Sequence, residues 1–338
     1  MDSDSKASKM NMGSLMTINK LKYALPSNMN VSERRTNKIS FADQNAYLSS
    51  AGNEVVIRMT ASTDYVYGPN CYLVFDIQTA GGTANTDRHG FKQNTAMALF
   101  SRSLFEDKSG AEIERNDSLG RYVAQVCPLH WSTEYTTTGV AMAGQQQSSY
   151  PNDPTATPPT YLANGSLANY DCRPSPLTVC IPLRWFLGVF NNETLIPSTL
   201  VSGALLRLQL ASVGEAFQQL EGDVAPTSYT ITNPRIVLDS ISLAPVVQKN
   251  LMEQSQSGGG LDYVYETVYY QSGNPGTSSN FNLQVNKAVS RCQKLYWSNR
   301  AQNTPVESAK NNLGTAQLNV NQLDYRLGDL NIKRVCVC

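Results

Sequence analysis

Two apolar strands joined by a proline-containing loop, within residues 175–212, constrain the fold of this 338-residue chain more than any other stretch. Apolar residues alternate with others from Leu177 to Pro182 and again from Leu205 to Leu210, which is the period-two pattern of β-strands. Large apolar side chains without helical spacing fill the connection. The stretch predicts a buried pair of strands and nothing equipped for chemistry. Its predicted core residues are Leu177, Val179, Ile181, Trp185, Phe186, Leu206, Leu208 and Leu210.

The composition favours a β-rich structural protein over a helical enzyme. Charged residues make up only 16% of the chain, whereas exposed helix faces are usually rich in Glu and Lys. The 27 basic and 27 acidic residues cancel, so the whole-chain charge does not indicate nucleic-acid binding. The seven cysteines are odd in number and form no Cys-x-x-Cys pair, which is typical of reduced intracellular thiols.

No targeting or membrane-spanning segment is expected. The N-terminal residues contain no apolar signal-peptide core, and no run approaches the ~18 apolar residues that cross a bilayer. The sequence therefore predicts synthesis and folding in the cytosol of a cell.

Further period-two runs divide the chain into regions. Strands are predicted at 54–60, 71–78, 101–106, 111–115 and 229–243, the last interrupted at Asn233-Pro234, and a short helix at 93–100. Residues 37–245 then form one β-domain, with a long polar surface insertion at 131–175. Residues 1–36, which end in Glu33-Arg34-Arg35, read as a flexible arm, either disordered or ordered by a partner.

A second region follows a linker. Residues 246–260 combine a helix with a Gly-rich joint, and residues 261–338 begin a second β region. In that region residues 263–270 alternate as a strand with one aromatic face.

Four segments, in order, carry a resemblance to a known family. ALFSRSLFEDKSGAEIERNDSLGRYVAQV (98–126), IPLRWFLGVFNNETLIPSTLVSGALLRLQL (181–210), NPRIVLDSISLAPVVQKNLMEQ (233–254) and the pair LDYVYETVYYQSG and VSRCQKLYWSNR (261–273 and 289–300) resemble segments of double-jelly-roll major capsid proteins. The resemblance is to the polinton-like, adintovirus and virophage-type lineage of small and medium DNA viruses.

The resemblance implies an all-β fold, a jelly-roll β-sandwich followed by an incomplete second jelly roll. It implies a non-enzymatic major capsid protein, located in the virion, that self-assembles into trimeric, pseudo-hexagonal capsomers of an icosahedral shell. Its partners are then itself and minor capsid or penton proteins, with no cofactor. Arg34 and Arg35 are candidate contacts with material inside the shell.

One departure from the family pattern concerns the region after residue 260. It holds about three predicted strands, whereas a jelly roll needs about eight. Either later strands are missing because the chain is truncated, as the terminal Val-Cys-Val-Cys repeat suggests, or a partial sheet uses a partner's edge.

No catalytic, cofactor-binding or metal-binding residues are predicted. His89 and His130 lie in separate loops, and no hydrolase or phosphate-loop motif occurs. Glu112 and Glu114 share a strand face, which predicts two solvated carboxylates. One alternative function is a carbohydrate-binding β-sandwich, a lectin or viral attachment protein, stacking sugars on Tyr263, Tyr265, Tyr269 and Tyr270. A β-sandwich hydrolase would instead require a cleft with a perturbed carboxylate.

Overall fold

The computed structural model describes most of the predicted first domain. The described residues are 31–49, 53–60, 63–82, 89–91, 96–120, 122, 176–219, 226–256, 263–271, 323–327 and 330–334. The predicted insertion at 131–175, residues 1–30 of the predicted arm and most of the predicted second jelly roll lie outside this set. The existence of a second jelly roll therefore stays a prediction.

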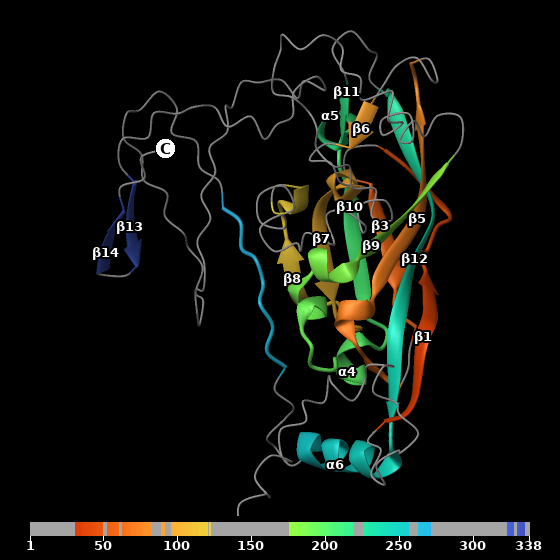
Figure 1. Cartoon of the computed structure of the whole chain (residues 1–338), viewed down its shortest axis with the longest axis vertical. Helices are drawn as coiled ribbons and strands as arrows, with labels where there is room; N and C mark the ends of the chain where they lie inside the picture. The colour runs from red at the N-terminus through yellow and green to blue at the C-terminus, as the bar shows by residue number, and fades with distance from the viewer. Residues whose placement is uncertain are drawn as a thin grey trace, which may run out of the picture.

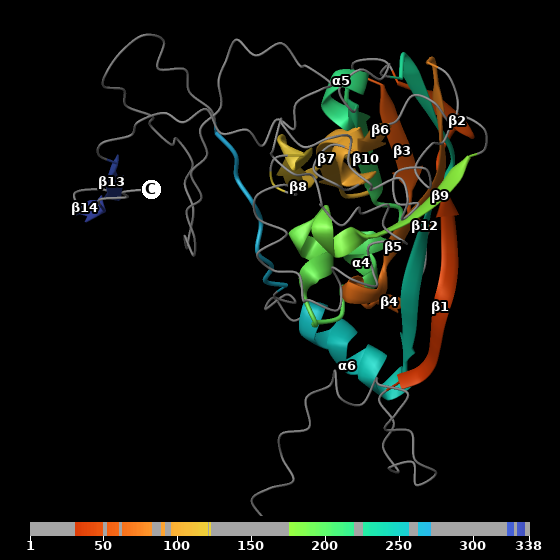
Figure 2. The same cartoon turned by 45° about the horizontal axis from the view of Figure 1, so that its top comes forward.

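Two antiparallel sheets form the body of the protein (Figure 1). The first has the order β1 (Val31–Phe41), β12 (Ser228–Leu243), β5 (Tyr72–Ala80), β9 (Leu177–Pro182), and is here called sheet A. The second, sheet B, has the order β3 (Glu54–Arg58), β10 (Leu205–Leu210), β7 (Phe100–Glu106), β8 (Glu112–Asn116). Turning the molecule shows the two sheets on opposite sides of one body (Figure 2).

The strand pairing is that of a jelly roll. Taken in chain order, the eight strands pair first with last, second with seventh, third with sixth and fourth with fifth: β1·β12, β3·β10, β5·β9 and β7·β8. Such a chain is one long antiparallel hairpin rolled up, so that successive pairs alternate between the sheets. The cross-pairs β12·β5 and β10·β7 join the rolled pairs into two four-stranded sheets. This is the eight-stranded, two-sheet jelly-roll architecture.

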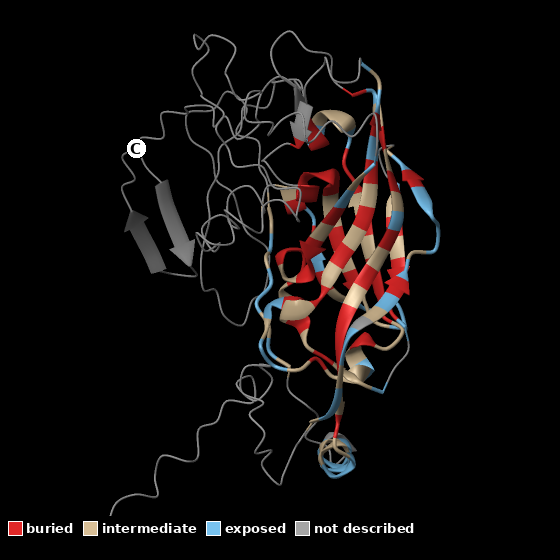
Figure 3. Ribbon diagram, turned by 45° about the vertical axis from the view of Figure 1, so that its right-hand side comes forward, coloured by how far each residue is buried: buried red, intermediate tan, exposed pale blue. Residues whose placement is uncertain are grey.

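A single core lies between the sheets. Inward residues alternate with outward ones along the central strands, as on β5, where Leu73, Phe75 and Ile77 are fully buried (Figure 3). Aromatic rings link the sheets edge to face, including Phe75 with Phe100 at 5.7 Å between ring centroids. The alternation predicted from sequence is thus realised as a sandwich interior.

Short elements close the ends of the sandwich. The 3₁₀ turns η2 (Gly68–Asn70), η8 (Leu183–Trp185) and η9 (Gly188–Asn191), with the helical turn α4 (Ser198–Val201), lie in connections between strands. The turn η4 (Ala96–Leu99) overlaps the helix predicted at 93–100, and α5 (Val213–Ala216) precedes the small sheet formed by β6 (His89–Phe91) and β11 (Phe217–Gln219). β4 (Tyr65–Val66) is a short addition to sheet A. Residues 323–327 and 330–334 form the hairpin β13–β14.

Strand β12 is longer and less interrupted than its sequence predicts. It continues through Asn233-Pro234, where a register irregularity against β5 and a left-handed backbone at Asn233 (φ 51°) absorb the proline. Its later half pairs with β1 and its earlier half with β2 (Ala46–Leu48). β1 and the shorter β2 therefore both pair along β12 in sheet A.

The prediction of a flexible arm over residues 1–36 is wrong for residues 31–36, because they belong to β1. Val31 pairs with Leu243 and Arg34 with Ile241, so the first jelly roll begins at residue 31. The segment is polar because β1 is an edge strand with much of its length exposed, and polar edge strands lack the alternation on which sequence reasoning depends.

The linker helix is present as α6 (Pro245–Gln256), which starts directly after β12 and leaves one end of the sandwich (Figure 1). Residues 263–271, here called the strap, return along the flank formed by β8 and η9. The strap is extended but forms no β-ladder among the described residues, so the strand predicted at 263–270 is wrong as a sheet strand.

Candidate functional site: the seam beneath the strap

Glu114 is the centre of the most unusual polar site in the described structure. The sequence predicts that it shares a solvated face with Glu112, and this is wrong: Glu112 is exposed, whereas Glu114 is 5% exposed. The reason is a β-bulge, since Phe105 opposes Glu114 and Glu106 opposes Glu112 across a register shift. The extra residue Ile113 turns the two carboxylates to opposite faces.

The buried carboxylate is held by backbone donors. The N–H groups of Gly188 and Val189, in η9, each donate to one Glu114 oxygen at 2.9 Å. Burial raises the pKa of Glu114 above its ordinary value, while these two hydrogen bonds and one from the Thr267 side chain oppose the rise. Glu114 therefore ties three segments together: β8, η9 and the strap.

Two tyrosines dock the strap onto the jelly roll. The Tyr263 hydroxyl donates to the Val189 carbonyl and the Tyr265 hydroxyl to the Ile113 carbonyl, both at 2.7 Å. Their rings lie 6.2 Å apart and pack against the core. Burial raises the pKa of both hydroxyls, so both stay protonated and able to donate.

Gly188 permits the close approach of the strap. A Cβ at this position would lie 1.6 Å from the Glu266 carbonyl oxygen. No ordinary side chain fits there without displacing the strap. Asn192 adds a further tie by donating its side-chain N–H to the Val264 carbonyl oxygen at 2.5 Å.

These contacts between the strap and the residues of β8 and η9, here called the seam, fasten the strap to the jelly roll. The hydrogen-bond partners of Glu114 are the Gly188 and Val189 N–H groups and the Thr267 side chain. Two of the four tyrosines proposed for sugar stacking are turned inward and hydrogen-bonded to backbone. Tyr269 is 48% exposed, and Tyr270 is half-buried.

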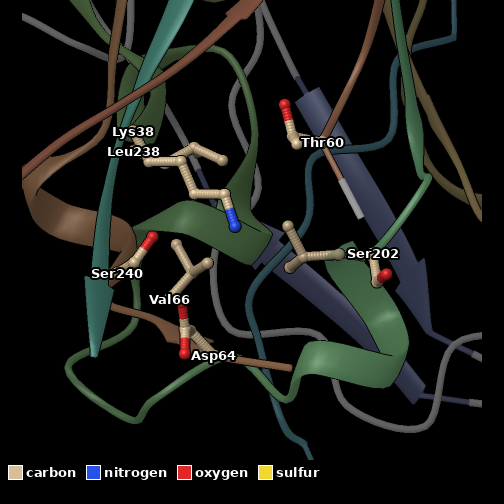
Figure 4. Close-up of a pocket in the computed structure, with 8 residues that line it drawn as sticks. Lys38, Thr60, Asp64, Val66, Ser202, Leu238 and Ser240 are labelled. Carbon is tan, nitrogen blue, oxygen red and sulfur yellow. The ribbon is translucent and has the colours of Figure 1, made fainter. Parts of the chain in front are cut away.

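Other candidate chemistry is absent from the part of the chain that the structure describes. There, no three His, Cys, Asp or Glu side chains gather as metal ligands. A cavity of about 10 Å³, room for roughly one water molecule, lies between β1, β12 and α4 (Figure 4). The Lys38 ammonium points into it, beside Ser240 and Asp64. Such a cavity is too small for a substrate.

The predicted core residues of the strand pair lie where the two sheets meet. Val179, Ile181, Phe186, Leu206 and Leu208 are at most 1% exposed. Leu210 is 2% and Trp185 9% exposed, and Leu177 is partly buried against the core. Phe186 reaches the opposite sheet through its contact with Phe100, at 5.6 Å between ring centroids.

Arg34 and Arg35 differ in environment although they are adjacent. The Arg34 guanidinium donates through Nε to Asp239 Oδ1 at 2.9 Å and through Nη2 to Oδ2, and it lies 5.8 Å from the Tyr67 ring centroid. Asp239 is fully buried and also accepts from Asn70 at 3.0 Å. Arg35 is exposed and pairs with Glu33. Arg34 thus joins β1 to β12 within the fold, and contacts of Arg34 and Arg35 with material inside a shell stay a prediction.

Comparison with solved structures finds viral capsid proteins. The chain is similar to the Faustovirus major capsid protein at 10% identity (TM-score 0.42, covering 70% of this chain and 58% of that chain). It is similar at 9% identity to a chain in the cryo-EM structure of the Sputnik virophage (TM-score 0.40; 65% and 50%) and to the mavirus major capsid protein (TM-score 0.35; 68% and 50%). This chain therefore spans about half the length of the structures it matches.

No protein-family model matches the sequence, and no curated protein matches it. The assignment of the jelly roll therefore rests on the strand order of this chain. Among the described helices, none is long and apolar enough to cross a membrane.

Proposed function

We propose that this chain is a major capsid protein that self-assembles into the shell of a DNA virus. The observation that carries the proposal is where the family-like segments fall in the fold. Residues 98–126 include the β7–β8 hairpin, 181–210 run from β9 to β10, and 233–254 join β12 to α6. The motifs that resemble capsid proteins thus coincide with strands β7, β8, β10 and β12 of the jelly roll, with the end of β9 and with the exit helix.

Jelly rolls serve both capsid proteins and lectins, so the fold alone does not choose between these functions. The seam favours the structural role, because the hydroxyls of Tyr263 and Tyr265 donate hydrogen bonds to backbone carbonyls and so hold the strap in place. A lectin needs open aromatic faces beside a polar concavity.

Within this proposal, the finer features follow the family. Three copies form a pseudo-hexagonal capsomer, capsomers meet one another and the minor or penton proteins, and the product is the virion. The strap begins a second β region beside the first jelly roll, and the residues before β1 tie neighbouring capsomers from inside. The work of assembly is burial of subunit surface, which in obligate assemblies reaches about 2,000–5,000 Å².

Negative-stain electron microscopy with light scattering on the purified full chain tests the proposal. We expect a mass near three subunits and particles with a hexagonal outline. A monomer at all concentrations would contradict it. Binding of sugars by such a monomer in a glycan array, lost on substitution of Tyr269, would replace it with the carbohydrate-binding alternative.

A further inference from the structure

Part of the outward face of sheet A is apolar, whereas sheet B has charged pairs on its outward face. In register, two outward rows of sheet A are Ile39–Val237–Tyr72, which ends at the buried Pro182, and Phe41–Arg235–Val74–Cys180. The next rows along the strands, Thr232–Asp76–Thr178 and Thr230–Gln78, are polar. Side chains paired across antiparallel strands lie on the same face, so the first two rows form one surface, here called the outer band. All its members except Arg235 are apolar, and Phe41 and Ile39 are 64% and 42% exposed.

Sheet B provides an internal comparison. Its outward rows include Val56–Arg207–Leu104–Arg115, and Arg207 and Arg102 form ion pairs there with Glu106 and Glu54. Charged lattices of this kind are typical of a solvated sheet face. The apolar rows of sheet A have no such lattice, and an exposed apolar patch of this kind is suited to contact with protein.

The strap indicates what covers the outer band. It is bonded to β8 and η9, on the flank away from β1 (Figures 1 and 2), so these residues of the same chain do not cover sheet A. The outward side of the strap carries Val264, 78% exposed, and the exposed Glu266. Within the outer band, Arg235 forms no ion pair with a carboxylate of the described residues. One of its N–H groups donates a hydrogen bond to the Asn233 carbonyl.

We propose that the outer band of sheet A packs against the strap of a second copy of this chain, with Arg235 facing Glu266. The inference rests on the proposed function and names the surfaces through which copies meet. The two surfaces differ, so the contact is head-to-tail, and head-to-tail contacts close into rings when the rotation permits. A three-membered ring uses every band and every strap once.

Matched valine substitutions on the two sheets test the band in the full chain. Val74→Asp places a charge in the outer band, and Val56→Asp places the same charge on the outward face of sheet B. Val74 and Val56 are both half-buried, so the two variants are matched. We expect Val74→Asp to weaken self-association at least tenfold in sedimentation experiments, while Val56→Asp associates like the wild type. Phe41→Asp, at a largely exposed position, gives the same result if Val74→Asp does not fold.

Charge reversal tests the partner surface. Arg235→Glu and Glu266→Arg each weaken association, and the double variant regains it. Normal association of Phe41→Asp, or equal loss in Val56→Asp, overturns the outer band as the interface while leaving self-assembly itself intact. Failure of the double variant to regain association overturns the strap as its partner. A wild-type chain that never associates overturns the capsid proposal as well.

Discussion

Substitution of Gly188 by alanine is the sharpest test of the seam. The backbone of Gly188 is outside the left-handed region, so alanine meets no conformational penalty there, and only space is limiting. The added methyl would lie 1.6 Å from the Glu266 carbonyl oxygen and 3.2 Å from Glu114 Oε1. Because carbon and oxygen in contact stay about 3.5 Å apart, the strap must retreat by roughly 2 Å.

A retreat of that size breaks the hydrogen bonds that Tyr263 and Tyr265 donate at 2.7 Å. Each is worth about 1 kcal/mol net, and the two rings lose part of their packing as well. We expect a total loss of about 2–4 kcal/mol, which for a domain of this size lowers Tm by roughly 5–15 °C. Hydrogen exchange at residues 263–271 should rise strongly while exchange in β5 and β12 changes little.

Gly110→Ala is the matched control. Gly110 has a φ of 86° and no atom within 4 Å of an added Cβ, so its alanine variant has backbone strain of about 1 kcal/mol without a collision. Its strap should exchange as in the wild type. The reasoning is refuted if Gly188→Ala has the same Tm as the wild type and residues 263–271 exchange their amide hydrogens no faster.

Two further predictions concern buried charge. The folded-state pKa of Glu114 is raised above its ordinary 4.5, so the folded protein binds this proton more tightly than the unfolded chain and loses stability as pH rises from about 4.5 through the raised value. Thermal melts over this range should show a fall that Glu114→Gln lacks, and an equal fall in both proteins would contradict the assignment. Arg34→Ala leaves Asp239 buried without its cation and should cost about 3–5 kcal/mol in chemical denaturation. Arg35→Ala removes only an exposed pair and should melt like the wild type; similar losses in both would exclude a special role for Arg34.

The strands that sequence reasoning predicted are those whose side chains alternate. One face of each of these strands lies in the core, so buried residues alternate with less buried ones along the sequence. They are β3, β5, β9, β10 and β12. The β7–β8 hairpin followed from its Asp-Lys-Ser-Gly turn, where Asp107 accepts hydrogen bonds from the Ser109 and Ala111 N–H groups. Local chemistry was sufficient for these elements.

The missed features depend on distant partners. β1 is polar, and it is a strand because β12 offers a free edge to it. The strap alternates like a strand, but its tyrosines satisfy the carbonyls of Val189 and Ile113 instead of a ladder. Glu114 is buried because a bulge turns it inward and two N–H groups of η9 converge on it. A charge two residues from another carries no signal of such a bulge.

Three edges of the two sheets are covered or charged, which limits how a further strand could add to them. The β3 edge is covered by residues 42–43, where the Asp43 N–H donates to the Val56 carbonyl at 3.0 Å. On the β8 edge, the Ile113 carbonyl already accepts a hydrogen bond from Tyr265 of the strap. The β1 edge carries the exposed Glu33–Arg35 ion pair. Covered and charged edges resist the addition of strands from another molecule, which is the route to open-ended growth. Strand addition at these three edges is therefore disfavoured, and head-to-tail contacts between faces close into assemblies of defined size where the rotation between copies permits.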